Sequence, residues 1–518
     1  MYDLTIKNGT VLDGTGAEGF IADVSVKDGK IAFIGKCDCE ASEVIDAAGL
    51  TVTPGFIDSH SHSDSAMLVN PDQKEKIQQG ITTCIAGQCG STPAPIGKDL
   101  APFEIYQVDS FGLNTDVFRT MGSFLDLVRD IPQGCNIATF VGHSALRRAA
   151  MGMENREPTE KELEKMRSLL RDGMEHGAVG VSFGLIYTPS CYSKTPELIE
   201  LAKVSVSYGG LVVAHIRDEG DYLIEAVEEF ISIIRASGAK GVISHHKSSG
   251  KRNWGKVKTT IKMIEKASEE GLDIYCDVYP YNASHTTLHS HFIPAEYHTG
   301  GPAGIVKLLS DNDMRQKLKE INRKDQGNNY DWIQITLCTG YPEYQGLRIP
   351  EIAKLHGTDQ LDAVFDMIRD SNTRCSACYF TMCEEDVETV IAFPRSMIGT
   401  DSGIAGASKV FHPRLVGTFP RALGRYSRQR GVVSLPEMVR KMTSLPAYVY
   451  NLETKGKLQV GFDADICIFD ADRIIDRAEF TDCSRKADGL NYVLLNGKVV
   501  VKDAVFLGDR QGKVLLRK

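Results

Sequence analysis

The sequence predicts an α/β protein: a (β/α)8 TIM-like barrel with a small β-sandwich domain formed from both termini. Three observations lead to this prediction. Short apolar runs alternate with helical stretches through the middle of the chain. Both ends instead contain short strand-like runs separated by turn residues. The length of 518 residues is sufficient for one large barrel and one smaller domain.

The two ends of the chain are expected to form the small domain together. Residues 1–52 alternate apolar and polar positions and contain the dipeptides Asn8-Gly9 and Asp28-Gly29, which are typical of turns. Residues 455–518 show the same pattern, with a strand-like run at residues 493–501. Neither end contains a helical stripe. We therefore expect one β domain made of residues 1–52 and 455–518.

The middle of the chain, residues 53–454, is expected to be a (β/α)8 barrel. Helical stretches such as Glu160–His176 and Leu223–Ser237 carry apolar residues three and four positions apart. Repeated strand–helix units predict a parallel sheet, and about eight of them predict a closed barrel. Residues from about 285 to 350 are less regular and form a possible insertion. The apolar runs after the first lie at residues 81–87, 137–141, 179–182, 211–214, 241–244, 272–278 and 396–400.

Composition and charge favour a small-molecule substrate over a polymer or a membrane. Hydrophobic residues make up 42% and charged residues 25% of the chain, which is typical of a globular protein. The formal net charge of −9 disfavours nucleic acid and anionic membranes as partners. The start lacks a signal-peptide pattern, and the thirteen cysteines have no framework spacing, which together predict a cytoplasmic protein. Nothing in the sequence specifies an oligomeric state.

Two histidines follow the first apolar run of the barrel. His60 and His62 lie two residues apart at a strand end, so their imidazoles can point to one place. An H-x-H pair often arises by chance, and further ligands at later strand ends decide its meaning. Imidazole, thiolate and carboxylate are zinc ligands, and strand ends converge only if the barrel closes. The further candidates follow the second, fifth, sixth and last runs and are Cys89, His215, His245 and Asp401.

These residues also have structural interpretations. Cys89 could be a core cysteine, and His215 and His245 could be core histidines with satisfied hydrogen bonds. Lys247 and Arg414 could be solvated surface charges. The catalytic residues of such barrels lie at the carboxyl ends of the strands, so the position of the first three favours the ligand interpretation.

Several segments together resemble the amidohydrolase superfamily, and within it the D-aminoacylase (N-acyl-D-amino-acid deacylase) group. The first two are the run from Gly55 to His62 and the run from Gly80 to Thr83 that leads to Cys89-Gly90. The resemblance covers nearly the whole chain, and the combination is more specific than any one segment. The supporting segments lie at residues 184–187, 214–220, 244–247, 277–281, 412–414 and 417–421.

The resemblance implies roles for the candidate ligands. One tightly bound Zn²⁺ is expected at Cys89, His215 and His245. A possible second, weaker metal position is expected at His60 and His62. The remaining candidate, Asp401, matches the residue that acts as general base and then general acid. Three protein ligands leave a zinc coordination position for water, which is typical of a catalytic site.

The resemblance also implies a substrate-binding set, namely Tyr187, Lys247, Tyr279 and Arg414. The chain departs from the family pattern at Gln88, where asparagine is common, and at His285, where a second serine is common. The second departure leaves the side-chain pocket undefined. We expect residues 285–350 and the loop Ala405–Val410 to shape that pocket. His143 also ends a strand and receives no role.

The activity implied is zinc-dependent hydrolysis of the amide bond of N-acyl-D-amino acids to a carboxylate and the free D-amino acid. One alternative is a cyclic-amide hydrolase of the dihydropyrimidinase or hydantoinase kind. Such enzymes usually bridge two metals with a carbamylated lysine after the fourth strand, and residues 179–185 contain no lysine. A less favoured alternative is a non-catalytic scaffold, which predicts missing ligands. The preferred side chain and acyl group are not specified.

Overall fold

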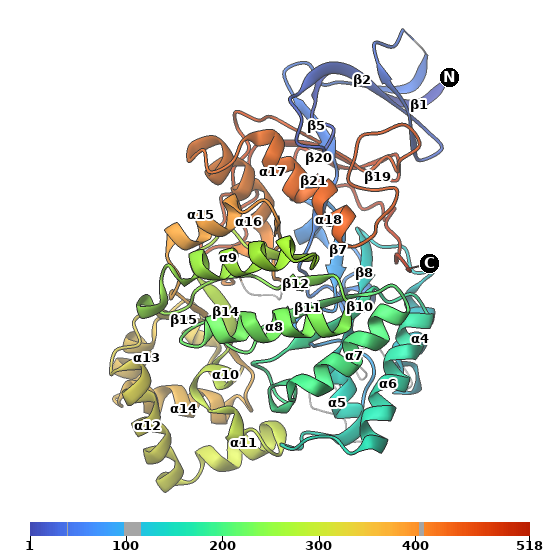
Figure 1. Cartoon of the computed structure of the whole chain (residues 1–518). Coiled ribbons are helices and arrows are strands. Elements are labelled where there is room, and N and C mark those ends of the chain that lie inside the picture. The colour runs from blue at the N-terminus through green and yellow to red at the C-terminus, as the bar shows by residue number, and fades with distance from the viewer. Residues whose placement is uncertain (39, 98–114, 404–408, 518) are drawn as a thin grey trace.

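The terminal domain is one hydrogen-bonded sheet assembled from both ends of the chain, seen at the top of Figure 1 where blue and red strands lie together. The computed structural model describes residues 1–38, 40–97, 115–403 and 409–517. The sheet order is β21-β20-β19-β18-β5-β1-β2-β3, and β4 pairs with β1. The strands are β1 (Tyr2–Val11), β2 (Phe20–Lys27), β3 (Lys30–Gly35), β4 (Ala41–Asp46), β5 (Thr51–Pro54), β18 (Ile466–Phe469), β19 (Leu490–Leu495), β20 (Lys498–Lys502) and β21 (Val505–Phe506).

The junction of the two ends is the antiparallel pair β5–β18, in which Val52 lies opposite Ile468. The predicted turn at Asp28-Gly29 joins β2 to β3, and both residues have the positive φ that a tight hairpin requires. The other predicted turn, Asn8-Gly9, is wrong. The two residues lie inside β1, where the pairing with β2 shifts register between Ile6 and Gly9. This β-bulge contains one extra residue on β1, and Asn8 within it has a φ of 62°.

The barrel predicted for the middle of the chain is present. Its strands are all parallel and form two arcs, β6-β7-β8 and β9-β10-β11-β12-β13-β17. Counting the consecutive β8 and β9 as one, the described residues supply eight strands. The strands are β6 (Phe56–Asp58), β7 (Ile81–Ala86), β8 (Asn136–Thr139), β9 (Val141–Gly142), β10 (Gly180–Gly184), β11 (Leu211–His215), β12 (Gly241–Ile243), β13 (Ile274–Val278) and β17 (Ser396–Ile398).

The barrel closes between its first and last strands. The Ser59 amide donates to the Ile398 carbonyl at 3.3 Å, and the His62 amide donates to the Ser402 carbonyl at 3.0 Å. The Asp401 amide donates to the His60 carbonyl at 2.8 Å. These bonds join positions about 340 residues apart and bring the ends of β6 and β17 together.

Helices cover the barrel, as Figure 1 shows for α7, α8 and α9. The start of α6 is fixed by a capping box, in which Thr159 and Glu162 satisfy each other's backbone amides. The helices are α1 (Ala66–Val69), α2 (Lys74–Ile77), α4 (Met121–Val128), α5 (His143–Met151), α6 (Glu160–Glu175), α7 (Thr195–Ser207), α8 (Leu223–Ser237), α9 (Lys256–Glu269), α15 (Glu384–Ala392), α16 (Arg414–Arg421), α17 (Leu435–Met442) and α18 (Ser444–Val449).

A small α/β unit lies between β13 and β17 and has its own hydrophobic core. It contains an antiparallel sheet of order β14-β16-β15 and five helices. The predicted insertion of 285–350 falls within it, and we propose that the inserted region extends to Tyr379. Its elements are β14 (Ser284–Thr287), α10 (Leu288–Phe292), α11 (Gly301–Leu309), α12 (Asn312–Gln326), β15 (Ile333–Cys338), α13 (Ile349–His356), α14 (Gln360–Asp370) and β16 (Cys375–Tyr379).

The fold class is therefore confirmed as a parallel barrel with a separate β domain, while the boundaries 1–52, 53–454 and 455–518 remain a proposal.

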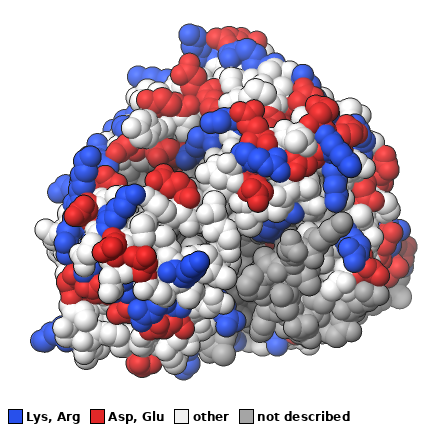
Figure 2. Space-filling view, turned by 90° about the horizontal axis from the view of Figure 1, so that it is seen from below, with Lys and Arg blue, Asp and Glu red and all other residues white. Residues whose placement is uncertain are grey.

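On the face seen in Figure 2, acidic and basic side chains are interspersed. Within the described part of the chain, no helix has the length and apolar character needed to cross a membrane.

A buried lysine stabilises the junction between the first and last strands of the barrel, β6 and β17. Lys76, on α2, is 1% exposed, and its Nζ donates to Asp58 Oδ2 at 2.9 Å, to the Ser402 carbonyl at 2.9 Å and to Thr400 Oγ1 at 2.5 Å. The lysine thus ties the end of β6 to the residues on both sides of Asp401. A buried charge with this many partners specifies one arrangement of the two strand ends.

We expect Lys76→Met to lower the free energy of unfolding by roughly 3–5 kcal/mol, because it leaves the buried Asp58 carboxylate without its cation. Urea denaturation with circular dichroism measures the change. The matched control is Lys74→Met on the same helix, where the side chain is 58% exposed and little change is expected. Equal unfolding midpoints for the two variants would contradict the role given to Lys76.

Candidate functional site

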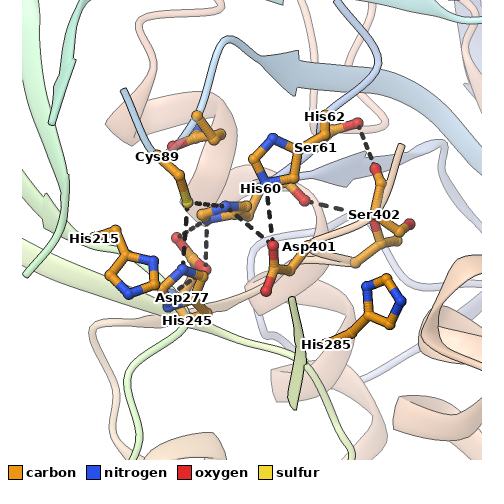
Figure 3. Close-up of polar contacts among 12 residues, drawn as sticks. His60, Ser61, His62, Cys89, His215, His245, Asp277, His285, Asp401 and Ser402 are labelled. Carbon is orange, nitrogen blue, oxygen red and sulfur yellow. Dashed lines mark hydrogen bonds and ion pairs between the residues drawn. The ribbon is translucent and has the colours of Figure 1, made fainter. Parts of the chain in front are cut away.

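Four side chains from distant strand ends meet at one point of the barrel rim. One ligand atom from each of His60, Cys89, His245 and Asp401 lies within 4.8 Å of the other three. Figure 3 shows the four side chains pointing toward one another. All four are buried. The sequence placed each of them after an apolar run, and the closed barrel brings them together.

The Cys89 thiol is the centre of this group. Its Sγ lies 3.4 Å from His60 Nε2 and 3.3 Å from His245 Nε2. Burial alone would raise the pKa of Cys89, but His60 and His245 hold it well below its ordinary value. Burial would likewise lower the pKa of His60, whereas Asp277 and Cys89 hold it well above its ordinary value. The two histidines therefore favour the thiolate, the form that binds metal.

The backbone is strained at three of these residues. Cys89, His245 and Asp401 have φ values of 53°, 36° and 47°, in the left-handed region that residues other than glycine rarely adopt. Such conformations cost about 1–3 kcal/mol each and concentrate at functional sites. The Cys89 loop is held by Ser182 of β10, whose hydroxyl accepts from the Gly90 amide at 3.1 Å and donates to the Gly87 carbonyl at 2.5 Å.

Asp277, near the end of β13, orients two of the histidines, and our sequence analysis did not single it out. Its carboxylate lies 3.2 Å from His60 Nδ1 and accepts from the His245 backbone amide at 2.7 Å. An Nδ1–H donated to Asp277 turns His60 Nε2 toward the Cys89 sulfur. This pairing of a carboxylate with a histidine is typical of metal sites. The sequence signal available was a carboxylate within a strand of the barrel.

His215 supplies the test of whether a metal fits. It is 4% exposed, and neither ring nitrogen has a hydrogen-bond partner among the described residues. Its ring centroid is 4.3 Å from that of His245, and the two form a second candidate metal group with Glu219. Buried polar atoms without partners are rare in proteins, so these nitrogens indicate an ion. A set of one thiolate and several imidazoles suits zinc.

His62 lies beside the group rather than in it. Its side chain is 32% exposed, and Nε2 lies 3.2 Å from Asp401 Oδ1. Despite the opposing effect of burial, Asp401 and Cys89 raise the pKa of His62 to about 9. Asp401 Oδ2 in turn accepts from Arg414 Nη1 at 2.7 Å. Burial would raise the pKa of Asp401, but Arg414 and His245 hold it well below its usual range.

A cavity of about 540 Å³ opens beside the candidate ligands, and all four predicted substrate-binding residues line it. The Arg414 guanidinium lies over the Tyr279 ring at 4.6 Å, and Lys247 Nζ is 5.5 Å from the same ring. The hydroxyl oxygens of Tyr187 and Thr286 lie 3.3 Å apart. Other lining residues come from strand ends and from the inserted unit, and include Ser91, Ser144, Thr188, Glu219, Ser284, His289, Ser290 and Phe411.

His285, the second departure from the family pattern, also lines the cavity. Its Nε2 lies 2.8 Å from Thr336 Oγ1, and Figure 3 shows the ring apart from the candidate ligands. Burial, with a contribution from Arg414, lowers the pKa of His285 to about 3, so the imidazole is neutral. Residues 405–408 of the predicted pocket loop lie outside the described residues.

Two further histidines do not join the candidate ligands. His143 is buried between Ser190 Oγ and Glu197 Oε1, each 2.8 Å from a ring nitrogen. His246, next to His245 in the chain, brings Nε2 to 2.7 Å from Thr260 Oγ1. Both rings have protein partners, in contrast to His215.

Comparisons with known proteins agree with this geometry. The model of the amidohydrolase family matches residues 43–501. A D-aminoacylase from Alcaligenes xylosoxydans xylosoxydans is 35% identical and covers 100% of this chain and 98% of its own length.

Two solved structures also match closely. An N-acyl-D-glutamate deacylase from Bordetella bronchiseptica, complexed with zinc and a phosphonate inhibitor, has 34% identity, a TM-score of 0.85 and 99% coverage of both chains. A D-aminoacylase studied for its binuclear metal centre has 36% identity, a TM-score of 0.85 and 100% coverage of both chains. The chain belongs to the amidohydrolase family.

Proposed function

We propose that this protein is a zinc-dependent hydrolase that cleaves the amide bond of N-acyl-D-amino acids to a carboxylate and the free D-amino acid. The observation that carries the proposal is the group of His60, Cys89, His245 and Asp401, here called the Cys89 group, whose ligand atoms lie within 4.8 Å of one another. The group borders a cavity that Lys247 and Arg414 also line. The related D-aminoacylase and N-acyl-D-glutamate deacylase, which match over nearly their whole length, support the same substrate class.

In this proposal Cys89, His215 and His245 hold the tightly bound zinc. His60 and His62 belong to a second, weaker position beside it, in line with the binuclear centre studied in the related D-aminoacylase. Zinc in such a site supplies Lewis acidity, which polarises the amide carbonyl and lowers the pKa of water toward 7. The thiolate and the unpartnered His215 nitrogens are the donors that support zinc over a hard cation.

Asp401 handles the proton. Its Oδ1 lies 3.2 Å from His62 Nε2 and 3.5 Å from His60 Nε2, and the residue lines the cavity, so a substrate bound there can reach the carboxylate. Asp401 accepts the proton of the attacking water and later donates it to the departing nitrogen, because an amine leaves far more easily than an amide anion. The neighbouring Arg414 keeps this carboxylate ionised before the reaction.

Arg414 and Lys247 anchor the substrate's α-carboxylate. One face of the guanidinium lies on Tyr279. Nη1 donates to Asp401 at 2.7 Å and Nη2 donates to the His285 carbonyl at 3.5 Å, which leaves further N–H groups for the incoming carboxylate. Tyr187 and Tyr279 form the adjoining walls. With the carboxylate anchored, the configuration at Cα determines which of the remaining groups reaches Asp401, and this supports selection of one enantiomer.

The alternatives have less support. No lysine occurs from Gly180 to Ser193, where cyclic-amide hydrolases usually carry the bridging lysine. A scaffold without chemistry has no need of strained ligands around a thiolate. A cytoplasmic location stays part of the proposal, as does the lack of nucleic-acid and membrane partners, which the net charge of −9 supports.

We expect metal-quantified protein to hydrolyse N-acetyl-D-amino acids and to leave the L-enantiomers and dihydropyrimidines unchanged. A panel of both enantiomers, scored by release of free amine, measures this. The control is zinc-loaded Asp401→Asn, which is expected to lose about 10²–10⁴-fold in kcat while keeping its zinc, because the proton acceptor is gone. Hydrolysis of L-substrates alone, or wild-type turnover by Asp401→Asn, would contradict the proposal.

We expect Arg414→Ala to raise KM for an N-acetyl-D-amino acid by one to three orders of magnitude, because a charge-assisted contact is worth about 1.5–3 kcal/mol or more when buried. Steady-state kinetics at saturating zinc measure it. The matched control is Arg421→Ala, which removes an arginine of the same helix that also stacks on a tyrosine, Tyr281 at 4.5 Å, and pairs with Asp476 at 3.0 Å. An equal rise in KM for both variants would contradict the proposal that Arg414 binds the substrate's α-carboxylate.

A further inference from the structure

Glu219 is a buried carboxylate between two groups that the proposed mechanism uses separately. It lies in the loop after β11, and its side chain is 15% exposed. Its Oε1 accepts from Lys247 Nζ at 2.5 Å and lies 3.0 Å from His245 Nδ1. His215 Nε2 is 3.7 Å away. Neither the sequence motifs nor the substrate-binding set gave this residue a role.

The same ring nitrogen of His245 faces two competing partners. Lys247 Nζ lies 2.8 Å from His245 Nδ1, slightly closer than the Glu219 oxygen at 3.0 Å. An ammonium can only donate, so a contact with it requires Nδ1 to be without a proton, and the proton then resides on Nε2. A carboxylate can only accept, so a contact with it requires the proton on Nδ1 and leaves Nε2 bare.

Only the second form can bind the metal. His245 Nε2 is the nitrogen that faces the Cys89 sulfur, at 3.3 Å. A proton on Nε2 blocks coordination, whereas a bare Nε2 permits it. The ammonium of Lys247, which is proposed to anchor the substrate, therefore opposes zinc binding unless another group engages it. Glu219 is the described carboxylate within reach of both.

We propose that Glu219 is a positioning residue that selects the metal-binding tautomer of His245, by accepting the His245 Nδ1 proton and by pairing with the Lys247 ammonium that competes for that nitrogen. The inference rests on the proposed zinc site but not on the identity of the substrate. It assigns to Glu219 for His245 the task that Asp277 performs for His60.

Zinc affinity, measured by competition with a chromophoric chelator and without substrate, tests the inference. We expect Glu219→Ala to bind zinc about 10–100-fold more weakly than wild type. Glu219→Gln keeps one acceptor oxygen and is expected to fall between the two. The matched control is Glu225→Ala, an exposed carboxylate on the next helix, whose affinity is expected to stay within about twofold of wild type.

The decisive variant is the double substitution Glu219→Ala with Lys247→Met. Methionine cannot donate to His245 Nδ1, so we expect the double variant to recover most of the zinc affinity that Glu219→Ala loses. A double variant as weak as Glu219→Ala, or a Glu219→Ala with wild-type affinity, would overturn the inference. If wild-type protein binds no zinc, the proposed function itself fails, which separates the two results.

Discussion

The rest of the site depends on hydrogen bonds that close the barrel between β6 and β17. These two strands lie about 340 residues apart in the chain, and the bonds between the His60–His62 and Asp401–Ser402 backbones hold their ends in register. Lys76 reinforces the junction from a position where water cannot compete. Because Asp401 is located only by this closure, a shift of one residue in the pairing would remove it from the Cys89 group.

Two carboxylates, those of Asp277 and Glu219, orient the rings of His60 and His245. Asp277 holds Nδ1 of His60, and Glu219 faces Nδ1 of His245, so both rings present Nε2 to the Cys89 sulfur. Neither ring nitrogen of His215 has a hydrogen-bond partner among the described residues, and the nearest carboxylate oxygen, of Glu219, is 3.7 Å from Nε2, which is why these nitrogens point to an ion. The site therefore combines one thiolate with imidazoles whose donor atoms are already turned inward. Such preorganisation lets the protein bind a metal without rearranging its ligands.

Most of the fold and the candidate ligands could be predicted because they follow from local patterns. Apolar runs mark the strands, and Cys89, His215 and Asp401 could be found because each stands directly after one. The bulge at Asn8 could not, since Asn-Gly is equally suited to a turn and to a left-handed residue within a strand.

Residues defined by tertiary contacts were also missed. Lys76 stands in a run, Lys74-Glu75-Lys76, that reads as a solvated helix face, and only the closed barrel places it beneath Asp401. Glu219 and Asp277 lie inside segments that support the resemblance, but no spacing signal separates a carboxylate that contacts a metal-binding histidine from a surface charge. We propose that the inserted unit extends past residue 350 to Tyr379, because β16 pairs with β14 and β15 rather than with the barrel.

The most direct test of the central claim, that strand ends converge on one ion through the Cys89 sulfur, is X-ray absorption at the zinc K-edge of the purified, metal-quantified protein. We predict a single sulfur scatterer at about 2.3 Å together with nitrogen or oxygen scatterers at about 2.0–2.1 Å. The same spectrum of Cys89→Ser is expected to lack the sulfur shell. A wild-type spectrum with only nitrogen and oxygen neighbours would contradict the account.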